Sequence, residues 1–484
     1  MTTSLPEAQI LDNSLFRALV LQTKAISRSL LGLDAPFEAV ESVSLQVSNL
    51  AVREFLQGDL QRRSDELAKD LLVNGVLYRQ HLPGSVPYHS LSGHLINFRY
   101  TYRPVGIRNG PTVVPLELAA GLIEKATPAL AYAITLGYAK NDLRSYEETA
   151  AADHRMPPSR STMEDMAKAI GNHAQVAAPR IEAHLRKTER VPEGAHGISL
   201  GLDRVAVPME EDRPEGAPPK TRRKERTEPY ERAKPLAVDV NYRMAYVGTA
   251  SLVDEKGREL VTRRYTALPD EGPDEVVGRM MADVKNALDQ DPELKVGIVQ
   301  DGAPEMWTAV RAGLQGIGVV KFNEVIDRYH LNERLGKALR IVESNETVRK
   351  RLLGKWNELL DGSDQAAGEI LQWLGAGIEA VEKKRSNKEM EEYLSHLVYV
   401  ENNEREGRLR YRTTIARGLP IGSGATEGSC KSVVGQRVCG SGQRWRPEGL
   451  AAALTLRAIH RSDRLPGFWT HLSHRYTADI TQAA

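Results

Sequence analysis

The first part of the chain carries a helical repeat of apolar residues. Apolar positions recur at helical spacing over residues 15–31 and 37–72, so both segments are predicted to be helices. The stripe of the second helix consists of Leu56, Leu60, Leu67 and Leu71. Such a stripe predicts packing in a core or between two protomers. Alternation of apolar and polar residues over 96–102 predicts a strand.

Three short helices with start signals follow. The dipeptide Thr-Pro at 127–128 offers an N-cap and a proline at the first helical position. Ser145 with Glu148, and Ser161 with Glu164, form capping-box patterns. Consecutive short helices suit a helix-turn-helix module that binds DNA, and an ordinary helical bundle is the alternative.

In the DNA-binding interpretation, the last of these helices, residues 162–170, would enter a major groove. Arg155 and Arg160 precede it and could contact phosphates.

The pattern changes to β periodicity at Gly197. Strands are predicted over residues 198–209, 236–253, 259–266, 294–300 and 319–326, with an amphipathic helix over 274–288 and a short helix before the last strand. The order β-β-β-α-β-α-β predicts an α/β RNase H-like core with a mixed five-stranded sheet. A polar stretch over 210–234, which includes the basic segment 220–226, predicts a hairpin loop or an insertion.

A helical pattern over residues 330–411 predicts a large all-α insertion in this core, and a final amphipathic helix is predicted from about 447 to 460. The predicted regions are an N-terminal helical region with a short β-hairpin (1–125), a helix-turn-helix-like DNA-binding region (126–196), the first part of the core (197–330), the helical insertion (331–416), and the last part of the core with a glutamate-bearing helix and a C-terminal helix (417–484).

Composition narrows the class of protein. The 484 residues, 41% hydrophobic and 27% charged, are typical of a globular protein with several folding units. No apolar run is long enough to span a bilayer, and the first residues lack the pattern of a secretory signal. Two cysteines, Cys430 and Cys439, exclude a disulfide framework and a four-cysteine zinc site. These features predict a cytoplasmic protein without a membrane partner. The net charge of +1 does not by itself indicate a protein that binds nucleic acid, so any such binding would depend on local basic patches.

Three acids lie where they could bind divalent metal ions. Asp203 is inside the first strand, Asp301 ends the fourth, and Glu427 opens a helix after a glycine-rich segment. The first and fourth strands of an RNase H-like sheet are adjacent, so Asp203 and Asp301 would meet. Carboxylates that hold two Mg²⁺ or Mn²⁺ ions about 4 Å apart suit phosphodiester cleavage. Two alternatives stay open: arginines satisfy these acids, or Asp239 in the second strand is the first acid of the set.

At these residues the chain resembles bacterial insertion-sequence transposases of the ISKra type, related to the Mutator superfamily, over residues 197–456. The matching segments are SLGLDRVAVPM, YVGTASLVDEKGRELVTRRY, VGIVQDGAPEMW, EVIDRYHLNERL, GLPIGSGATEGSCKSVVGQRV and GSGQRWRPEG. The resemblance implies a catalytic and metal-binding DDE triad, here Asp203, Asp301 and Glu427. It also implies an Asp-x-x-His signature beside the triad, here Asp327 and His330.

The chain departs from the family pattern at two points. Arg204 follows the first acid where such proteins usually have glycine, and it could pair with that acid or with phosphate. The family's N-terminal part often carries a zinc ribbon, but this chain has no cysteine before Cys430, so any equivalent near residues 100–115 is not a cysteine zinc site.

A basic run surrounds the third acid and offers phosphate contacts. It comprises Lys431, Arg437, Arg444 and Arg446. A solvated helix face is the alternative for each of them. Trp445 is expected to pack in the fold, or alternatively to stack on an unpaired base.

The sequence therefore predicts a DNA transposase. It would recognise terminal inverted repeats, bind target DNA, and catalyse metal-dependent strand cleavage and strand transfer as a homodimer or higher oligomer on double-stranded DNA. One alternative is a domesticated relative that binds DNA without cutting it, which Arg204 favours and the retained triad disfavours. Another is a different RNase H-like nuclease, such as a junction resolvase, which the helical insertion and long N-terminal region disfavour.

Overall fold

The computed structural model describes residues 11, 14–32, 34–215, 238–301 and 303–483. The chain divides into two compact units, residues 1–177 with 464–484, and residues 178–463. The predictions for the first ten residues and for the basic segment 220–226 lie outside the described residues. No helix in the described part is both long and apolar enough to cross a membrane.

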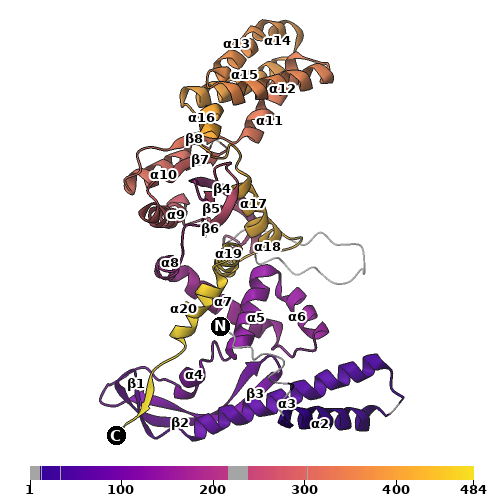
Figure 1. Ribbon diagram of the computed structural model, residues 1–484, viewed down its shortest axis with the longest axis vertical. Helices are drawn as coiled ribbons and strands as arrows, with labels where there is room; N and C mark the ends of the chain where they lie inside the picture. The colour runs from indigo at the N-terminus through magenta and orange to yellow at the C-terminus, as the bar shows by residue number, and fades with distance from the viewer. Residues whose placement is uncertain (1–10, 12–13, 33, 216–237, 302, 484) are drawn as a thin grey trace. The chain divides into compact units, whose positions relative to one another are not determined.

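The first unit combines helices with a four-stranded antiparallel sheet of order β3-β2-β1-β9. Its elements are α2 (Ser14–Leu31), α3 (Phe37–Asp65), β1 (Asp70–Val73), β2 (Val76–Ser90), β3 (Gly93–Pro104), α4 (Pro115–Ala120), α5 (Pro128–Lys140), α6 (Leu143–Ala152), α7 (Arg160–Val176), α20 (Leu465–Arg475) and β9 (Ile480–Gln482). Helix α2 packs along α3, and α5, α6 and α7 pack together (Figure 1).

The predicted helix over residues 37–72 is wrong in its last turns. Helix α3 ends at Asp65, and Leu71 instead lies in β1, where it is buried in the sheet. A two-residue turn at Asn74 and Gly75, both with positive φ, joins β1 to β2. Asn-Gly is a strong hairpin signal because both residues tolerate this conformation. Strand pairing therefore overrides the helical spacing.

The two capping-box predictions are also wrong. Asp142 is the N-cap of α6, and its carboxylate accepts hydrogen bonds from the N–H groups of Arg144 and Ser145. Ser159 caps α7 by accepting from the N–H of Thr162. Each helix begins earlier than the pattern suggested, because an acceptor side chain just before the helix satisfies the exposed N–H groups. The proline at 128 does occupy the first turn of α5, as predicted.

The second unit contains a five-stranded sheet, helices on its two faces and a helical insertion. Its elements are α8 (Ala178–Arg186), β4 (Gly197–Asp212), β5 (Val238–Val253), β6 (Glu259–Ala267), α9 (Pro273–Gln290), β7 (Lys295–Gln300), α10 (Pro304–Gly316), β8 (Asn323–Ile326), α11 (Arg328–Val342), α12 (Glu346–Gly362), α13 (Ala366–Ala376), α14 (Ile378–Lys384), α15 (Asn387–Arg405), α16 (Tyr411–Ala416), α17 (Gly424–Ser429), the π-helix η1 (Cys430–Gly435), α18 (Gln436–Val438) and α19 (Pro447–Arg461).

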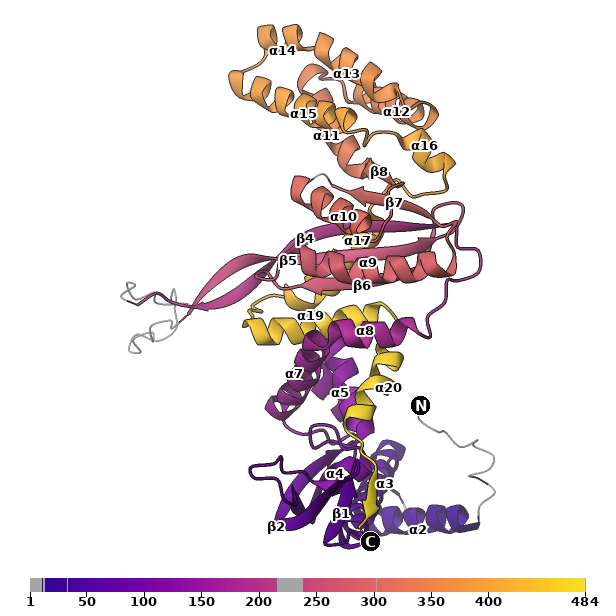
Figure 2. The ribbon, with the colours of Figure 1, turned by 90° about the vertical axis from the view of Figure 1, so that its left-hand side faces the viewer.

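The mixed five-stranded sheet predicted from the sequence is confirmed. Its order is β6-β5-β4-β7-β8. Strands β4, β5 and β6 are antiparallel neighbours, whereas β7 and β8 extend the sheet from β4 in parallel. Strands β4 and β5 also continue together beyond the sheet as a two-stranded arm (Figure 2).

Successive side chains of β4 point alternately toward the two helical layers that cover the faces of the sheet. Leu200 and Leu202 belong to the core cluster that includes residues of α9 and α10. Gly201 points to the opposite face, where it lies against Thr426 of α17. Successive side chains of a strand point to opposite faces, so Asp203 shares the face of Gly201, beneath α17.

Helices α11 to α16 form a separate helical group between β8 and α17 (Figure 1). Side chains from several of these helices, among them Trp356, Leu374 and Tyr393, are buried within it. The helical block predicted over residues 330–411 is therefore confirmed; it follows the edge strand β8 and precedes α17, which packs against β4 and β5.

Candidate active site

The register of the parallel strands places Asp301 beside Asp203. Strand β4 pairs with β7 from Gly197↔Lys295 to Leu200↔Ile298, so partners are 298 − 200 = 98 residues apart. Asp203 and Asp301 have the same separation, 301 − 203 = 98, and lie three residues beyond the last pair. If this register were continued past the end of β7, the two acids would be neighbours on the sheet face covered by α17.

The electrostatics of Asp203 agree with this placement. Burial raises the pKa of the Asp203 carboxyl, and the negative charge of Asp301 raises it further, while a 2.7 Å hydrogen bond from the backbone N–H of Arg204 lowers it. The side chain of Arg204 instead forms an ion pair with Glu305 of α10, at 3.0 Å. Arg204, which stands where the family usually has glycine, therefore pairs its guanidinium with Glu305 and not with Asp203.

Helix α17 presents Glu427 and is seated closely on the sheet. The hydroxyl groups of Thr426 and Thr249 of β5 are 2.7 Å apart and buried. A Cβ added at Gly201 would lie 1.9 Å from the Thr426 hydroxyl oxygen, so only glycine leaves room for the helix here. The glycine on β4 therefore determines how near Glu427 lies to the sheet.

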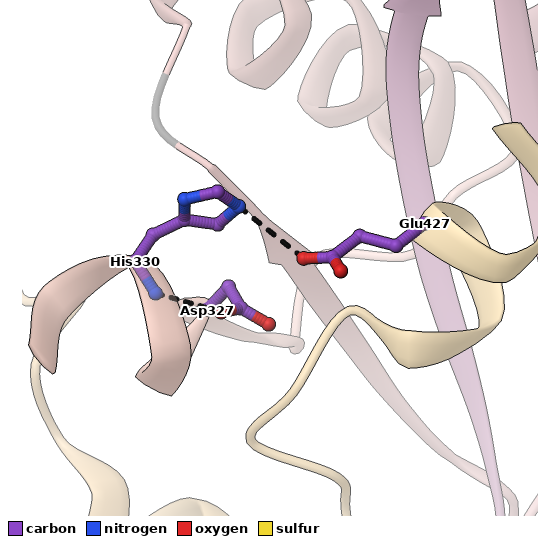
Figure 3. Close-up of side chains that lie close together, drawn as sticks. All are labelled: Asp327, His330 and Glu427. Atoms are coloured by element: carbon purple, nitrogen blue, oxygen red, sulfur yellow. Dashed lines mark hydrogen bonds and ion pairs between the residues drawn. The ribbon is translucent and has the colours of Figure 1, made fainter. Parts of the chain in front are cut away.

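A group of four residues, here called the acid–histidine cluster, joins the two ends of the helical insertion. Figure 3 shows three of them, Asp327, His330 and Glu427, and the fourth is Ser423. Asp327 is buried and caps α11, since one oxygen accepts from the His330 N–H at 3.0 Å. Its other oxygen accepts from the N–H and the hydroxyl of Ser423, at 2.5 and 2.9 Å. Asp327 thus ties the entry of the insertion to its exit.

The same cluster orients Glu427. His330 Nε2 lies 3.2 Å from Glu427 Oε1, and the Ser423 hydroxyl lies 3.2 Å from the same oxygen. Figure 3 shows the imidazole of His330 and the carboxylate of Glu427 pointing toward each other from two helices. One oxygen each from Asp327 and Glu427 and a nitrogen of His330 lie within 4.8 Å of one another, a spacing that a metal ion could also bridge.

Cys430 contacts the first acid of the predicted triad. It follows Glu427 by three residues, starts the π-helix η1, and its thiol donates to Asp203 Oδ2 at 3.4 Å. Burial raises the pKa of this thiol, and the charges of Asp203, Glu427 and Asp301 raise it further. The Cys430 thiol thus joins the end of the Glu427 helix directly to Asp203 on β4.

Tyr399 of α15 reaches the same region from the helical insertion. Its hydroxyl donates to the main-chain carbonyl of Asp301 at 2.9 Å. Burial raises the pKa of Tyr399 to about 12, so the hydroxyl keeps its proton near neutral pH. The guanidinium of Arg334 lies 4.9 Å from the centre of its ring.

The donor set fits a hard divalent cation. Asp203, Asp301 and Glu427 offer carboxylate oxygens, the ligands that Mg²⁺ and Mn²⁺ prefer. Among the ion pairs of the described ranges, none joins these three acids to a lysine or an arginine. Asp203 is half-buried, whereas Asp301 and Glu427 are exposed. Partial burial of a carboxylate near a second negative charge costs free energy unless a positive charge compensates it. A bound cation would supply that charge.

Asp239, the alternative first acid, lies in the arm of β4 and β5. It pairs in register with Glu211, whereas Asp203 pairs with Val247. The eight residues between 203 and 211 correspond to roughly 26 Å along the strand at about 3.3 Å per residue. Asp239 forms an ion pair with Arg213 at 3.4 Å. The structure thus brings Asp203, and not Asp239, to Asp301.

The basic run after Glu427 divides into exposed and buried members. Lys431 is exposed, whereas Arg437 is buried and stacks on Trp445 at 5.1 Å. The indole N–H of Trp445 donates to the carbonyl of Val438 at 2.9 Å, which favours its packing role. Arg444 is exposed and forms an ion pair at 2.9 Å with Glu210 of the arm.

Three other predicted DNA contacts are exposed side chains. Arg446 pairs with Asp212 of the arm at 2.8 Å. In the first unit, Arg155 is exposed, and Arg160 pairs with Glu147 at 2.7 Å. Ion pairs between exposed groups contribute little free energy, so phosphate could replace these partners.

Sequence reasoning missed three residues of the site. Ser423 lies in the glycine-rich segment before Glu427, and no role was predicted for it. Cys430 could have been found, because a residue three positions after Glu427 lies on the same helical face. Tyr399 carries no local signal, since its contact with Asp301 joins residues 98 positions apart.

Comparison with known proteins gives one match. A model described as an uncharacterised protein family (UPF0236) matches residues 246–466, less than half of the chain. The matched span begins after Asp203 and includes Asp301, the acid–histidine cluster and Cys430. No curated protein matches the chain.

Proposed function

We propose that the protein is a DNA transposase of the ISKra type, with an RNase H-like core and a DDE active site. The observation that carries this proposal is the position of Asp203 on β4 and of Asp301 just after the neighbouring parallel strand β7, with Cys430, three residues after Glu427, in contact with Asp203 at 3.4 Å. The strand order and directions of the sheet, the acids on adjacent strands and the helical insertion before Glu427 support it. Similarity of fold alone does not assign a reaction, so the proposal depends on the residues of the site.

In the proposed mechanism, Asp203, Asp301 and Glu427 would hold two Mg²⁺ or Mn²⁺ ions. Such ions supply an activated oxygen nucleophile and neutralise charge on the phosphate and the leaving oxygen. The chain itself contributes placement: β4 and β7 hold two carboxylates side by side, and α17 brings the third onto the same face.

The acid–histidine cluster keeps Glu427 in place during this reaction. His330 and the Ser423 hydroxyl both contact the Glu427 oxygen and restrict its rotation. Asp327 acts on Glu427 indirectly. Its oxygens accept hydrogen bonds from the backbone N–H of His330 and from the hydroxyl of Ser423, and these two residues contact Glu427. Mutation of groups that orient a metal ligand in this way typically costs about 10–100-fold in metal affinity or activity.

The proposed substrate is double-stranded DNA, with terminal repeats bound by the region before residue 197. In that region α7 would enter the major groove, with Arg155 and Arg160 on phosphates. Lys431, Arg444 and Arg446 would contact phosphates nearer to the triad. Two DNA ends must come together before joining, so assembly as a dimer or a higher oligomer on DNA belongs to the proposal.

The direct test is cleavage of DNA that carries the element's own terminal repeats. Asp301→Asn should abolish Mg²⁺-dependent cleavage and leave DNA affinity largely unchanged, because binding comes mainly from phosphate contacts elsewhere. Asp239→Asn is the matched control, since this acid lies in the arm, and it should cleave like the parent. Cleavage by Asp301→Asn at the parent rate would refute the proposed mechanism.

A further inference from the structure

The loop that carries Asp301 has a support from the helical insertion. Strand β7 ends at Gln300, whose carbonyl still accepts a hydrogen bond from the N–H of Asp327 at 2.9 Å. The carbonyl of Asp301 is the next one along the chain and lies beyond the strand ladder. Its hydrogen-bond donor is the Tyr399 hydroxyl, at 2.9 Å. Just beyond the end of β7, a side chain of α15 therefore hydrogen-bonds the backbone that the sheet no longer holds.

The ring of Tyr399 is itself held by α11. The guanidinium of Arg334 lies over it at 4.9 Å, within the range of a cation–π contact. Arg334 and His330 both belong to α11, whose first turn is capped by Asp327. Helix α11 therefore contacts Glu427 through His330. Through Arg334 it also contacts the ring of the tyrosine that hydrogen-bonds Asp301.

We propose that Tyr399 is a positioning residue, through which the helical insertion fixes the backbone at Asp301 and thereby the direction of its carboxylate. With His330 on Glu427, the insertion then aligns two of the three acids of the triad. This inference rests on the proposed metal-dependent function. Removal of a group that orients a metal ligand typically costs about 10–100-fold in metal affinity or activity.

The chain offers a matched control for a purely structural hydrogen bond. Tyr393 lies on the same helix, is buried, and donates its hydroxyl to the carbonyl of Leu374 at 2.6 Å. Tyr393→Phe and Tyr399→Phe each delete one hydroxyl that bonds a main-chain carbonyl. Only the second deletion touches the loop of Asp301.

The experiment uses the full-length chain and has two readouts. Mn²⁺ binding without DNA is followed by the electron paramagnetic resonance signal of free Mn²⁺, and cleavage of terminal-repeat DNA is measured against Mn²⁺ concentration. Tyr399→Phe should raise the dissociation constant and the half-saturating Mn²⁺ concentration about 10-fold. Tyr393→Phe should leave both unchanged.

Unchanged Mn²⁺ binding by Tyr399→Phe would overturn the role of Tyr399 while leaving the proposed function intact, provided that the parent binds Mn²⁺. Equal weakening in both variants would overturn it as well, because it would show a general loosening of the insertion. A parent chain that binds no Mn²⁺ would overturn the proposed function, and with it this inference.

Discussion

A methyl group at position 201 should displace the helix that carries Glu427. In Gly201→Ala the new Cβ would lie 1.9 Å from the Thr426 hydroxyl oxygen, 3.0 Å from the Thr426 Cβ and 3.2 Å from the carbonyl of Val299. Ordinary contact begins at 3.4 Å, so the closest pair must separate by 3.4 − 1.9 = 1.5 Å. The strand is held on both sides in the sheet, so we expect α17 to move.

The expected cost has a structural and a catalytic part. Overpacking a core costs about 1–3 kcal/mol, and loss of the buried hydroxyl contact between Thr426 and Thr249 adds roughly 0.5–1.5 kcal/mol. The free energy of unfolding should fall by about 2–4 kcal/mol in total. Misplacement of a reacting group by about 1 Å can cost 100-fold in rate, so cleavage should fall by at least about that factor.

The assay compares thermal unfolding and terminal-repeat cleavage for two glycine variants. Gly248→Ala is the control, because its Cβ would meet Val276 and Met280 of α9, on the opposite face, at 2.3 and 2.4 Å. Both variants should lose stability, but only Gly201→Ala should lose cleavage beyond its loss of folded protein. Adding Thr426→Ala removes the closest atom and should restore part of the rate. Parent-like cleavage by folded Gly201→Ala would refute the reasoning.

Three further predictions concern individual contacts. Ser423→Ala removes the hydroxyl shared by two carboxylates, so the free energy of unfolding should fall by about 1 kcal/mol in denaturant titration and cleavage should slow. Mild alkylation should label exposed Cys439 before buried Cys430, whose raised pKa disfavours the reactive thiolate; mass spectrometry that finds Cys430 labelled first would contradict its burial. Arg279→Ala should lower the free energy of unfolding by about 3–5 kcal/mol, because it leaves the buried carboxylate of Glu182 unpaired; a change under about 1 kcal/mol would argue against that ion pair.

The second unit was the more predictable part of the fold. Its strands over 198–209, 236–253, 259–266 and 294–300 were found within a few residues of their observed bounds, because alternation of apolar residues is a local signal. The last strand is shorter than predicted and begins at Asn323. The RNase H-like identity of this sheet stays a prediction.

The first unit shows where local patterns fail. Strand β2 contains Pro83 and Pro87, which argue against a strand, yet at these positions its ladder partner is β3, and the bridge on its other edge is at His89. Proline is tolerated there because the other edge of the strand needs no N–H donor for a partner. Strand β9, Ile480–Gln482, is too short to show periodicity and exists because it pairs with β1, about 400 residues earlier in the chain.

The sequence by itself determined the set of acids and their order. Strand periodicity placed Asp203 and Asp301 on separate strands, and the motif with Glu427 placed the third acid at the start of a helix. The assignment of all three to one metal site stays a prediction, although the sheet register gives Asp203 and Asp301 a common face.

Only the tertiary structure decided which other side chains lie around these acids and hold them in place. Arg204 pairs with Glu305, Ser423 joins Asp327 to Glu427, and Tyr399 supports Asp301. The physical reason is that hydrogen bonds, at about 3 Å between donor and acceptor, and close packing depend on which surfaces meet in the fold. Periodicity reports the face on which a residue lies, whereas the partner across that face comes from a distant segment.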